Sequence, residues 1–143
     1  MPPMRIEFSV PGVRGKARPI VTRHGTYTPK ESREYELLIA KSFCEAMFHA
    51  YAPGAWPMDG TYTVRIAAHY PVPKSWSKKK KLEAFAGALV PGKPDLDNVI
   101  KSVLDGLNGV CFRDDRQVER IEAEKHYSAT ELGHVDIIVE AEA

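Results

Sequence analysis

Two aspartates separated by one residue, Asp95 and Asp97, are the pair in this chain whose type and spacing point most directly to chemistry. Asp95 follows a break rich in proline and glycine at 91–94 and stands where a helix cap is expected, so Asp97 falls in the first turn. The helix dipole keeps carboxylates at this end ionised. Two converging anions repel unless a cation lies between them, and hard oxygen ligands suit Mg²⁺ or Mn²⁺ better than Zn²⁺. We therefore expect a divalent metal ion here.

A third carboxylate occurs further along the chain. After a short apolar run at 110–112, which we expect to return along a sheet, Asp114 and Asp115 lie in a polar turn, and either can complete the metal site. Lys101 lies one helical turn beyond Asp97, where its charge can hold a phosphate or stabilise a transition state. A metal held by such residues stabilises charge on a scissile phosphate and activates water. The pattern predicts metal-dependent phosphodiester cleavage.

An Asp-x-Asp pair also has other interpretations. A capping aspartate followed by an exposed acid shows this spacing without any metal. Enzymes that hold nucleotide-sugar diphosphates through a metal ion use the same pair. Asp105, two turns beyond Asp97, is expected to form an ion pair with Lys101 and to support the site rather than bind the metal. The rest of the sequence has to decide between these possibilities.

Hydrophobic periodicity predicts the elements that position these residues. Strict alternation of apolar and polar residues predicts strands, the last two of which we expect to close the sheet as an antiparallel pair. These strands are expected at 5–10, 62–70, 121–127 and 134–140. The stretch 13–27 has no periodicity and is expected to form an exposed basic loop or loose hairpin.

Apolar residues at spacings of three and four predict the helices. The first begins with Thr28 as its cap and ends before Pro53, and the second runs from Asp95 to Leu107. Ser77 can cap a short helix through 78–86. With no internal repeat and no linker, the chain is expected to form a single α+β domain over 1–143, with helices packed on a mixed β-sheet.

Charge is distributed unevenly although the net charge is only +1. Residues 1–30 hold six basic residues against one acid, and four consecutive lysines occupy 78–81. From residue 115 onward eight acids face three bases. The neutral total can therefore hide a basic face suited to phosphate.

Several classes of protein do not fit the composition. Cys44 and Cys111 are too few for a disulfide framework and lack zinc-ligand spacing, so we expect buried thiols. No apolar run approaches the roughly 20 residues of a membrane span. The N-terminus lacks the apolar core of a secretory signal, so a cytoplasmic location is expected. The five scattered histidines show no ligand spacing and are expected to have surface or strand-face roles; they are His24, His49, His69, His126 and His134.

A longer motif surrounds the acidic residues. The segments KPDLDNVIK at 93–101, LDGLNG at 104–109 and DDRQV at 114–118 resemble the signature of the RusA family of Holliday junction resolvases. The match has no gap from residue 93 to residue 118, which makes it far more specific than the aspartate pair alone. Outside this block the resemblance is looser but spans the chain.

The resemblance implies a homodimeric, Mg²⁺-dependent endonuclease, for which Mn²⁺ can substitute, acting on four-way DNA junctions in recombination and repair. Paired symmetric nicks would leave 5′-phosphate ends. The essential aspartates of the family correspond to Asp95, Asp97 and Asp115, which we expect to form one site per subunit, and its supporting lysine corresponds to Lys101. The residues expected to contact DNA phosphates are Arg14, Lys16, Arg18, Arg23, Lys78, Lys79, Lys80 and Lys93.

Two related functions remain open. A general nuclease selective for branched DNA would use the same residues on forks or flaps. A non-catalytic junction-binding protein would bind with a steep salt dependence but would show no metal-dependent cleavage.

Overall fold

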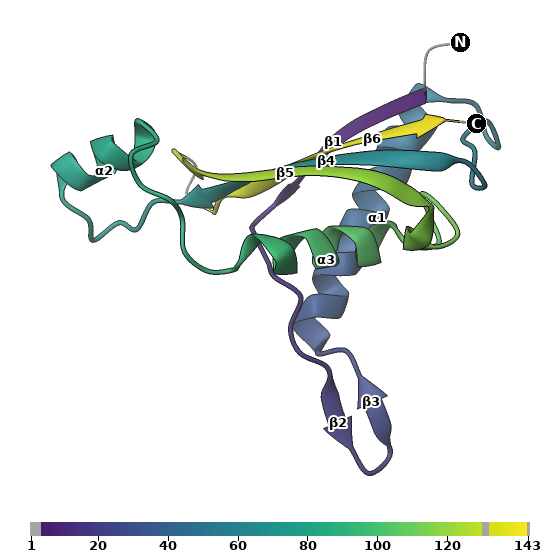
Figure 1. The fold of residues 1–143 in the computed structure, drawn as a ribbon, viewed down its shortest axis with the longest axis horizontal. Coiled ribbons are helices and arrows are strands. Elements are labelled where there is room, and N and C mark those ends of the chain that lie inside the picture. The colour runs from purple at the N-terminus through teal and green to yellow at the C-terminus, as the bar shows by residue number, and fades with distance from the viewer. Residues whose placement is uncertain (1–3, 130–131, 143) are drawn as a thin grey trace.

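A computed structural model describes residues 4–129 and 132–142 of the 143-residue chain (Figure 1). Its main sheet has four strands in the order β1-β6-β4-β5. Their bounds are β1 Met4–Pro11, β4 Thr61–Pro71, β5 Val118–Ser128 and β6 His134–Glu142. Strand β6 is antiparallel to both of its neighbours, whereas β4 and β5 are parallel. The predicted mixed sheet of an α+β fold is therefore confirmed.

Two helices cover one face of this sheet, and two smaller elements project from the body (Figure 1). The covering helices are α1 (Lys30–Ala50) and α3 (Leu96–Leu107). Helix α2 (Lys78–Phe85) lies beyond the end of the sheet, and the hairpin of β2 (Ile20–Thr22) and β3 (Gly25–Tyr27) extends away from it. A 3₁₀ turn, η1 (Asp115–Gln117), precedes β5. Among the described residues, no helix is both long and apolar enough to span a bilayer.

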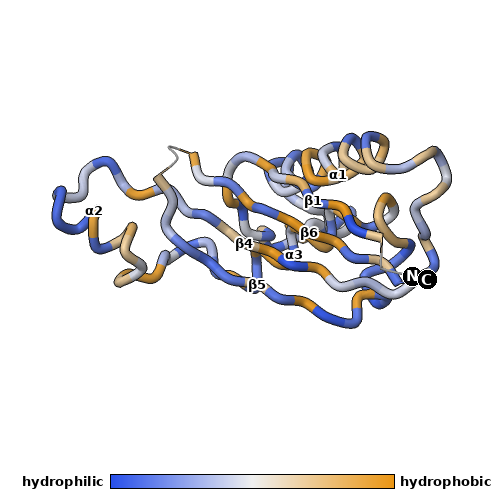
Figure 2. Tube along the Cα trace, turned by 90° about the horizontal axis from the view of Figure 1, so that it is seen from above, coloured by the Kyte–Doolittle hydropathy of each residue, from blue (hydrophilic) through white to orange (hydrophobic). Residues whose placement is uncertain are grey.

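The core forms where the alternating strand residues meet the apolar stripes of the helices. Every second residue of β4 from Tyr62 to Tyr70 is buried, and the intervening residues lie on the opposite, helix-free face. Figure 2 shows apolar residues along the central strands, apolar and polar residues alternating along α1, and polar residues over much of α2. The helix residues that complete this core include Tyr35, Ile39, Phe43, Val99, Val103 and Leu107. Helix α3 therefore packs with its apolar side on one face of the sheet, and no helix covers the opposite face of the sheet.

Helices α1 and α3 cross so closely that one glycine is required. A Cβ added at Gly106 would lie 2.7 Å from Cβ of Ile39 and 3.0 Å from the carbonyl oxygen of Glu36. We expect Gly106→Ala to lower the free energy of unfolding by about 1–3 kcal/mol, because overpacking outweighs the better helix propensity of alanine. Urea denaturation measures this change. Gly92→Ala is the matched control, since nothing lies within 4 Å of its added Cβ; equal stability of both variants would contradict the close approach.

Three local expectations differ from the structure. Helix α1 begins at Lys30 with Pro29 at the N-cap and no side-chain cap, so Thr28 does not have the predicted role. Strands β5 and β6 run in opposite directions but do not pair, because β4 lies between them. The run 110–112 forms a buried turn against the end of α3 instead of a strand. The predicted cap Ser77 is confirmed, since its hydroxyl accepts a hydrogen bond from the Lys80 amide at 3.2 Å.

Candidate active site

Asp95 occupies the N-cap position of α3, but its side chain does not cap the helix. Its backbone is extended, and its carbonyl oxygen accepts hydrogen bonds from the amides of Asn98 (3.1 Å) and Val99 (3.2 Å). The carboxylate makes no capping hydrogen bond and is exposed. The simple capping interpretation therefore does not account for this carboxylate, which remains available to a ligand outside the chain.

Asp97 and Lys101 lie one turn apart on the exposed side of α3. On the opposite side of the helix, Val99 and Val103 are fully buried in the core. Within the described part of the chain, neither the Asp97 carboxylate nor the Lys101 ammonium takes part in a side-chain hydrogen bond or an ion pair. Both charges are therefore free to act on a bound ion or phosphate.

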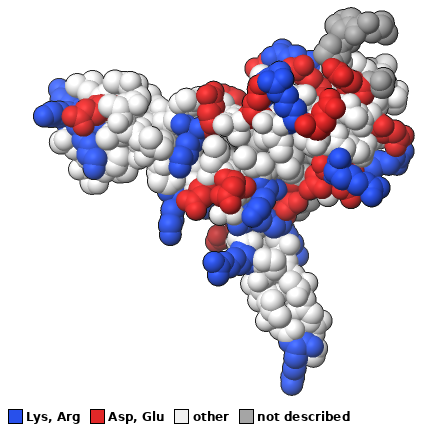
Figure 3. All heavy atoms as spheres, in the orientation of Figure 1, with Lys and Arg blue, Asp and Glu red and all other residues white. Residues whose placement is uncertain are grey.

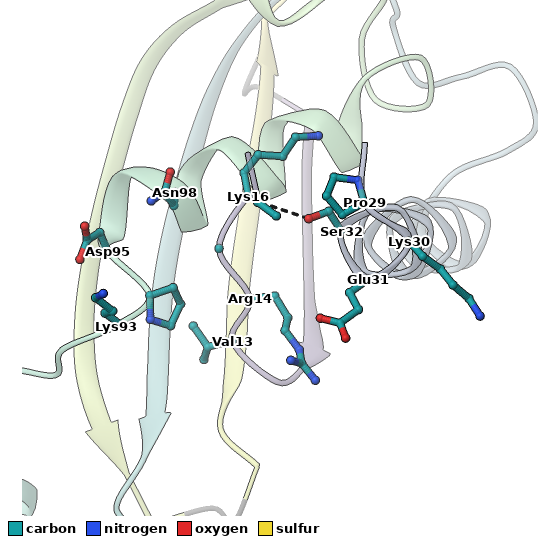
Figure 4. A pocket seen from close by; sticks show the side chains of 13 residues that line it. Val13, Arg14, Lys16, Pro29, Lys30, Glu31, Ser32, Lys93, Asp95 and Asn98 are labelled. Carbon is teal, nitrogen blue, oxygen red and sulfur yellow. Dashed lines mark hydrogen bonds between the residues drawn. The ribbon is translucent and has the colours of Figure 1, made fainter. Parts of the chain in front are cut away.

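A hollow of about 620 Å³ opens directly beside Asp95 (Figure 4). The basic loop lines one side with Arg14, the start of α3 lines another with Asn98, and Lys93 lies at the approach to the helix. The loop is fixed there because the Lys16 amide donates to the Asn98 carbonyl at 2.9 Å. The structure thus brings two predicted DNA-contacting residues, Arg14 and Lys93, next to a predicted metal ligand.

Lys16 lines the same hollow, but its ammonium is paired with two carboxylates and little exposed. Its ammonium contacts Glu36 Oε1 at 2.5 Å and Asp105 Oδ2 at 3.0 Å, and its side chain is only 18% exposed. Burial by itself would lower the pKa of Lys16, but the hydrogen bonds to these two carboxylates outweigh it, and the pKa is raised. Asp105 therefore pairs with Lys16 instead of the expected Lys101. This geometry favours a role for Lys16 in joining the loop, α1 and α3 over a role in binding DNA.

Asp114 and Asp115 differ sharply in their surroundings. The Asp114 carboxylate accepts a hydrogen bond from the Arg116 amide at 3.0 Å and forms a capping box with Gln117. That bond lowers the pKa of Asp114. Asp115 is largely exposed, and its pKa is raised by the small loss of solvent around its carboxyl, by a hydrogen bond with Asp114 and by the negative charges of Asp114 and Asp105. Because Asp114 is already used in the turn, Asp115 is the better candidate for a metal ligand.

Helix α3 separates Asp115 from Asp97 within one chain. The helix has 12 residues, so its ends are about 18 Å apart. Asp97 lies in its first turn, and the chain that leads to Asp115 is fixed at its last turn, where the Cys111 amide donates to the Leu107 carbonyl at 2.9 Å. The two carboxylates therefore belong to opposite ends of the helix.

Strand β4 gives an independent measure of the same separation. The Tyr70 hydroxyl, near the end of β4, donates a hydrogen bond to the Pro94 carbonyl, next to Asp95. The side-chain amide of Gln117, close to Asp115, donates a hydrogen bond to the carbonyl oxygen of Gly60, just before the start of β4 (3.0 Å). Nine residues of extended chain lie between Gly60 and Tyr70, so the backbone at these two positions is roughly 30 Å apart.

One ion cannot bridge this gap, because ligands about 2 Å from Mg²⁺ lie within a few ångströms of each other. Among the described residues, the group of three or more histidine, cysteine or acidic side chains whose ligand atoms all lie within 4.8 Å of one another is His69, His134 and Asp136, and it contains none of the three aspartates. The expectation that one subunit holds a complete site of Asp95, Asp97 and Asp115 is therefore not met by a single chain. The physical reason is the length of α3.

A comparison with protein families identifies the lineage of the chain. The family model described as endodeoxyribonuclease RusA matches residues 11–140. This chain belongs to the RusA family. The match includes both ends of α3 and the whole basic loop, so the separated carboxylates and the hollow are parts of one RusA-type domain.

A more limited similarity links this RusA family chain to a protein of Bacillus subtilis (strain 168), named uncharacterized protein YqaN. The two are 43% identical over 74 residues, which are 50% of this chain and 52% of YqaN. The matched region spans about half the length of that curated relative.

The remaining predicted DNA-contacting residues of this RusA family member lie on the two projecting elements. Arg18 and Arg23 lie before and within the β2–β3 hairpin, and the lysines at 78–80 lie on α2; all are exposed. Figure 3 shows Lys and Arg side chains on both projections, with few acidic groups among them. Basic charge therefore extends outward from the body in two directions.

Sequence reasoning missed one cluster. His69 and His134, for which the sequence predicted surface or strand-face roles and no ligand spacing, lie against Asp136 on the open face of the sheet. The usable signal was the alternation that places all three on the polar face of β4 and β6. The register that brings them together, with His69 opposite His134, is visible only in the folded sheet.

Proposed function

We propose that this RusA family chain is a Mg²⁺-dependent endonuclease that resolves four-way DNA junctions by paired symmetric nicks. The observation that carries the proposal is a pair of unbonded carboxylates at the start of α3, of which Asp95 lines a hollow together with Arg14 and Lys93 and Asp97 lies in the following helical turn. Cations beside a carboxylate pair are the arrangement expected where a DNA phosphate meets a metal ion. Membership of the RusA family supports branched DNA as the substrate of this arrangement.

The residues present fit a hard divalent cation. Asp95 and Asp97 offer exposed carboxylate oxygens, and Mg²⁺ is usually held by one or two carboxylates plus water and phosphate oxygens. When bound, such an ion would polarise the phosphate and activate water for attack, leaving a 5′-phosphate and a 3′-hydroxyl. Lys101 would neutralise charge on the phosphate, and Arg14 and Lys93 would orient the DNA backbone.

A second copy of the chain is proposed to complete the site. Because Asp115 lies at the far end of α3 from Asp97, an antiparallel approach of two α3 helices would bring Asp115 of the partner subunit towards Asp95 and Asp97. Two-fold symmetry would then create two identical composite sites, as paired nicking requires. This arrangement replaces the expectation of one complete site in each subunit.

Cleavage of a mobile four-way junction in Mg²⁺, mapped on all strands, tests the proposed function. We expect symmetric paired nicks from the natural chain. Asp97→Asn should bind the junction with unchanged affinity in a gel shift but cleave it at least about 10³-fold more slowly, because loss of a ligand removes several kcal/mol of transition-state stabilisation. Asp59→Asn, on an exposed ion pair with Arg113, is the matched control.

Other outcomes would redirect the assignment. Equal cutting of forks, flaps and four-way junctions would indicate a general branched-DNA nuclease. Tight, salt-sensitive binding with no cleavage in either Mg²⁺ or Mn²⁺ would indicate a junction-binding protein instead.

A further inference from the structure

Three side chains on the helix-free face of the sheet converge on one point. His69 lies on β4, and His134 and Asp136 lie on β6. The Nε2 atoms of His69 and His134 lie 3.1 Å and 3.5 Å from the same oxygen, Oδ2 of Asp136. All three ligand atoms lie within 4.8 Å of one another. These residues belong neither to α3 nor to the hollow beside Asp95.

The sheet holds these side chains in place. His69 and His134 are directly paired in the β4–β6 ladder, and their rings stack with centroids 4.4 Å apart and an interplanar angle of 17°. The Ser9 hydroxyl, on the neighbouring strand β1, donates a hydrogen bond to Oδ1 of Asp136. This bond orients the carboxylate so that Oδ2 is directed at the histidines, as outer partners of metal ligands commonly do.

The arrangement can hold a metal ion as well as a pair of hydrogen bonds. When both Nε2 atoms are unprotonated, each presents a lone pair towards the region occupied by the same carboxylate oxygen. A cation at this point would accept a lone pair from each Nε2 and from Oδ2. The side chains are 26% (His69), 30% (His134) and 41% (Asp136) exposed, so an ion can enter and water can fill a further position.

We propose that His69, His134 and Asp136 form a binding site for a divalent transition-metal ion of the Zn²⁺ class. Imidazole nitrogens favour such borderline ions, whereas Mg²⁺ prefers oxygen ligands, so this site is chemically distinct from the one proposed at α3. A bound ion would join β4 to β6, and through Ser9 also to β1. We expect it to stabilise the folded chain without taking part in cleavage.

Calorimetric titration of metal-stripped, tag-free protein with Zn²⁺ tests this site. We expect one ion per chain, a higher Tm with Zn²⁺, and retention of the ion in a large excess of Mg²⁺. His134→Gln and Asp136→Asn should each weaken Zn²⁺ binding at least about tenfold, since each removes one of three ligands. His49→Gln, a histidine on α1 outside the cluster, should leave binding unchanged.

Two results would overturn the proposal: no Zn²⁺ binding by the natural chain, or equal binding by the natural chain and His134→Gln. His69→Gln provides a second test if either first variant unfolds, as judged by the Tm of the metal-free proteins. All these readouts are independent of DNA cleavage, so a failed nuclease assignment would not affect them.

Discussion

A mixed dimer with Asp97→Asn in one chain and Asp115→Asn in the other should nick a four-way junction at one position, although each variant homodimer is nearly inactive. In a composite site, Asp97 of the second chain meets the intact Asp115 of the first, so one complete set of ligands survives. Each homodimer has lost a ligand from both sites and should cleave at least about 10³-fold more slowly than the natural dimer.

A reciprocal mixed dimer gives the opposite expectation and serves as the control. If one chain carries both Asp97→Asn and Asp115→Asn and its partner is natural, both composite sites lack a ligand, and the dimer should be inactive. A site contained in one chain would leave the natural partner competent for a single nick. Chains with different affinity tags allow both dimers to be purified and compared on strand-specific denaturing gels.

The two dimers separate failure of the composite site from failure of the proposed function. Activity only in the reciprocal dimer would show that each chain holds a complete site, which contradicts the separation of Asp97 and Asp115 along α3. Absence of cleavage by the natural dimer would instead refute the nuclease assignment itself. The experiment thus tests the geometric argument from α3 and β4 directly.

Local sequence patterns predicted the elements because their causes are local. Alternating side chains define β4, since each step along a strand reverses the face, and the stripe that includes Val99 and Val103 defines α3. The position of Asp95 at the start of α3 follows from the same local pattern. These features need no knowledge of distant residues.

Features that depend on distant contacts could not be predicted in this way. The neighbour of β5 is β4, because the chain between them crosses over through α2 and α3 and returns parallel, and no local signal distinguishes this from a hairpin with β6. The partner of Asp105 is Lys16, from a loop 89 positions earlier in the sequence (105 minus 16). The register between β4 and β6 likewise places His69 opposite His134, and the local sequence pattern does not predict that register.

The candidate site shows the same division between local and distant information. Asp95, Asp97 and Asp115 could be selected from a contiguous motif, but their spatial relation depends on the direction in which α3 runs. Asp97 and Asp115 are close in the sequence motif, but a helix of 12 residues separates them in the folded chain. The choice of Asp115 over Asp114 came from the family resemblance, and the hydrogen bond that the Arg116 amide donates to the Asp114 carboxylate agrees with it.

Helix α2 is connected directly to the start of α3, and we expect its lysines to contact DNA phosphates there. It lies beyond the end of β4, and the chain returns from it to the start of α3 (Figure 1). Trp76, just before the helix, packs edge-on against Tyr127 of β5 with centroids 5.4 Å apart, and the Lys80 ammonium lies 4.1 Å from the Trp76 ring centroid. These contacts anchor the basic projection to the sheet.

Replacing Lys78, Lys79 and Lys80 with glutamine should weaken junction binding roughly 10- to 100-fold at moderate salt. Each lysine that neutralises a phosphate contributes about 0.9 to the slope of log affinity against log salt, so the slope should fall by up to about 2.7. Gel shifts over a salt series measure both quantities. Lys41→Gln, an exposed lysine on α1 that pairs with Glu45, controls for the loss of charge as such.

Cleavage at saturating DNA distinguishes binding from chemistry in this triple variant. Because α2 contributes none of the proposed metal ligands, the rate of nicking within the bound complex should remain within about twofold of the natural rate, while the apparent KM rises. A lower rate at saturation with unchanged affinity would assign α2 to positioning the scissile phosphate. An unchanged affinity and an unchanged salt slope would instead place the junction on another face, and the basic loop beside Asp95 would then have to carry the phosphate contacts.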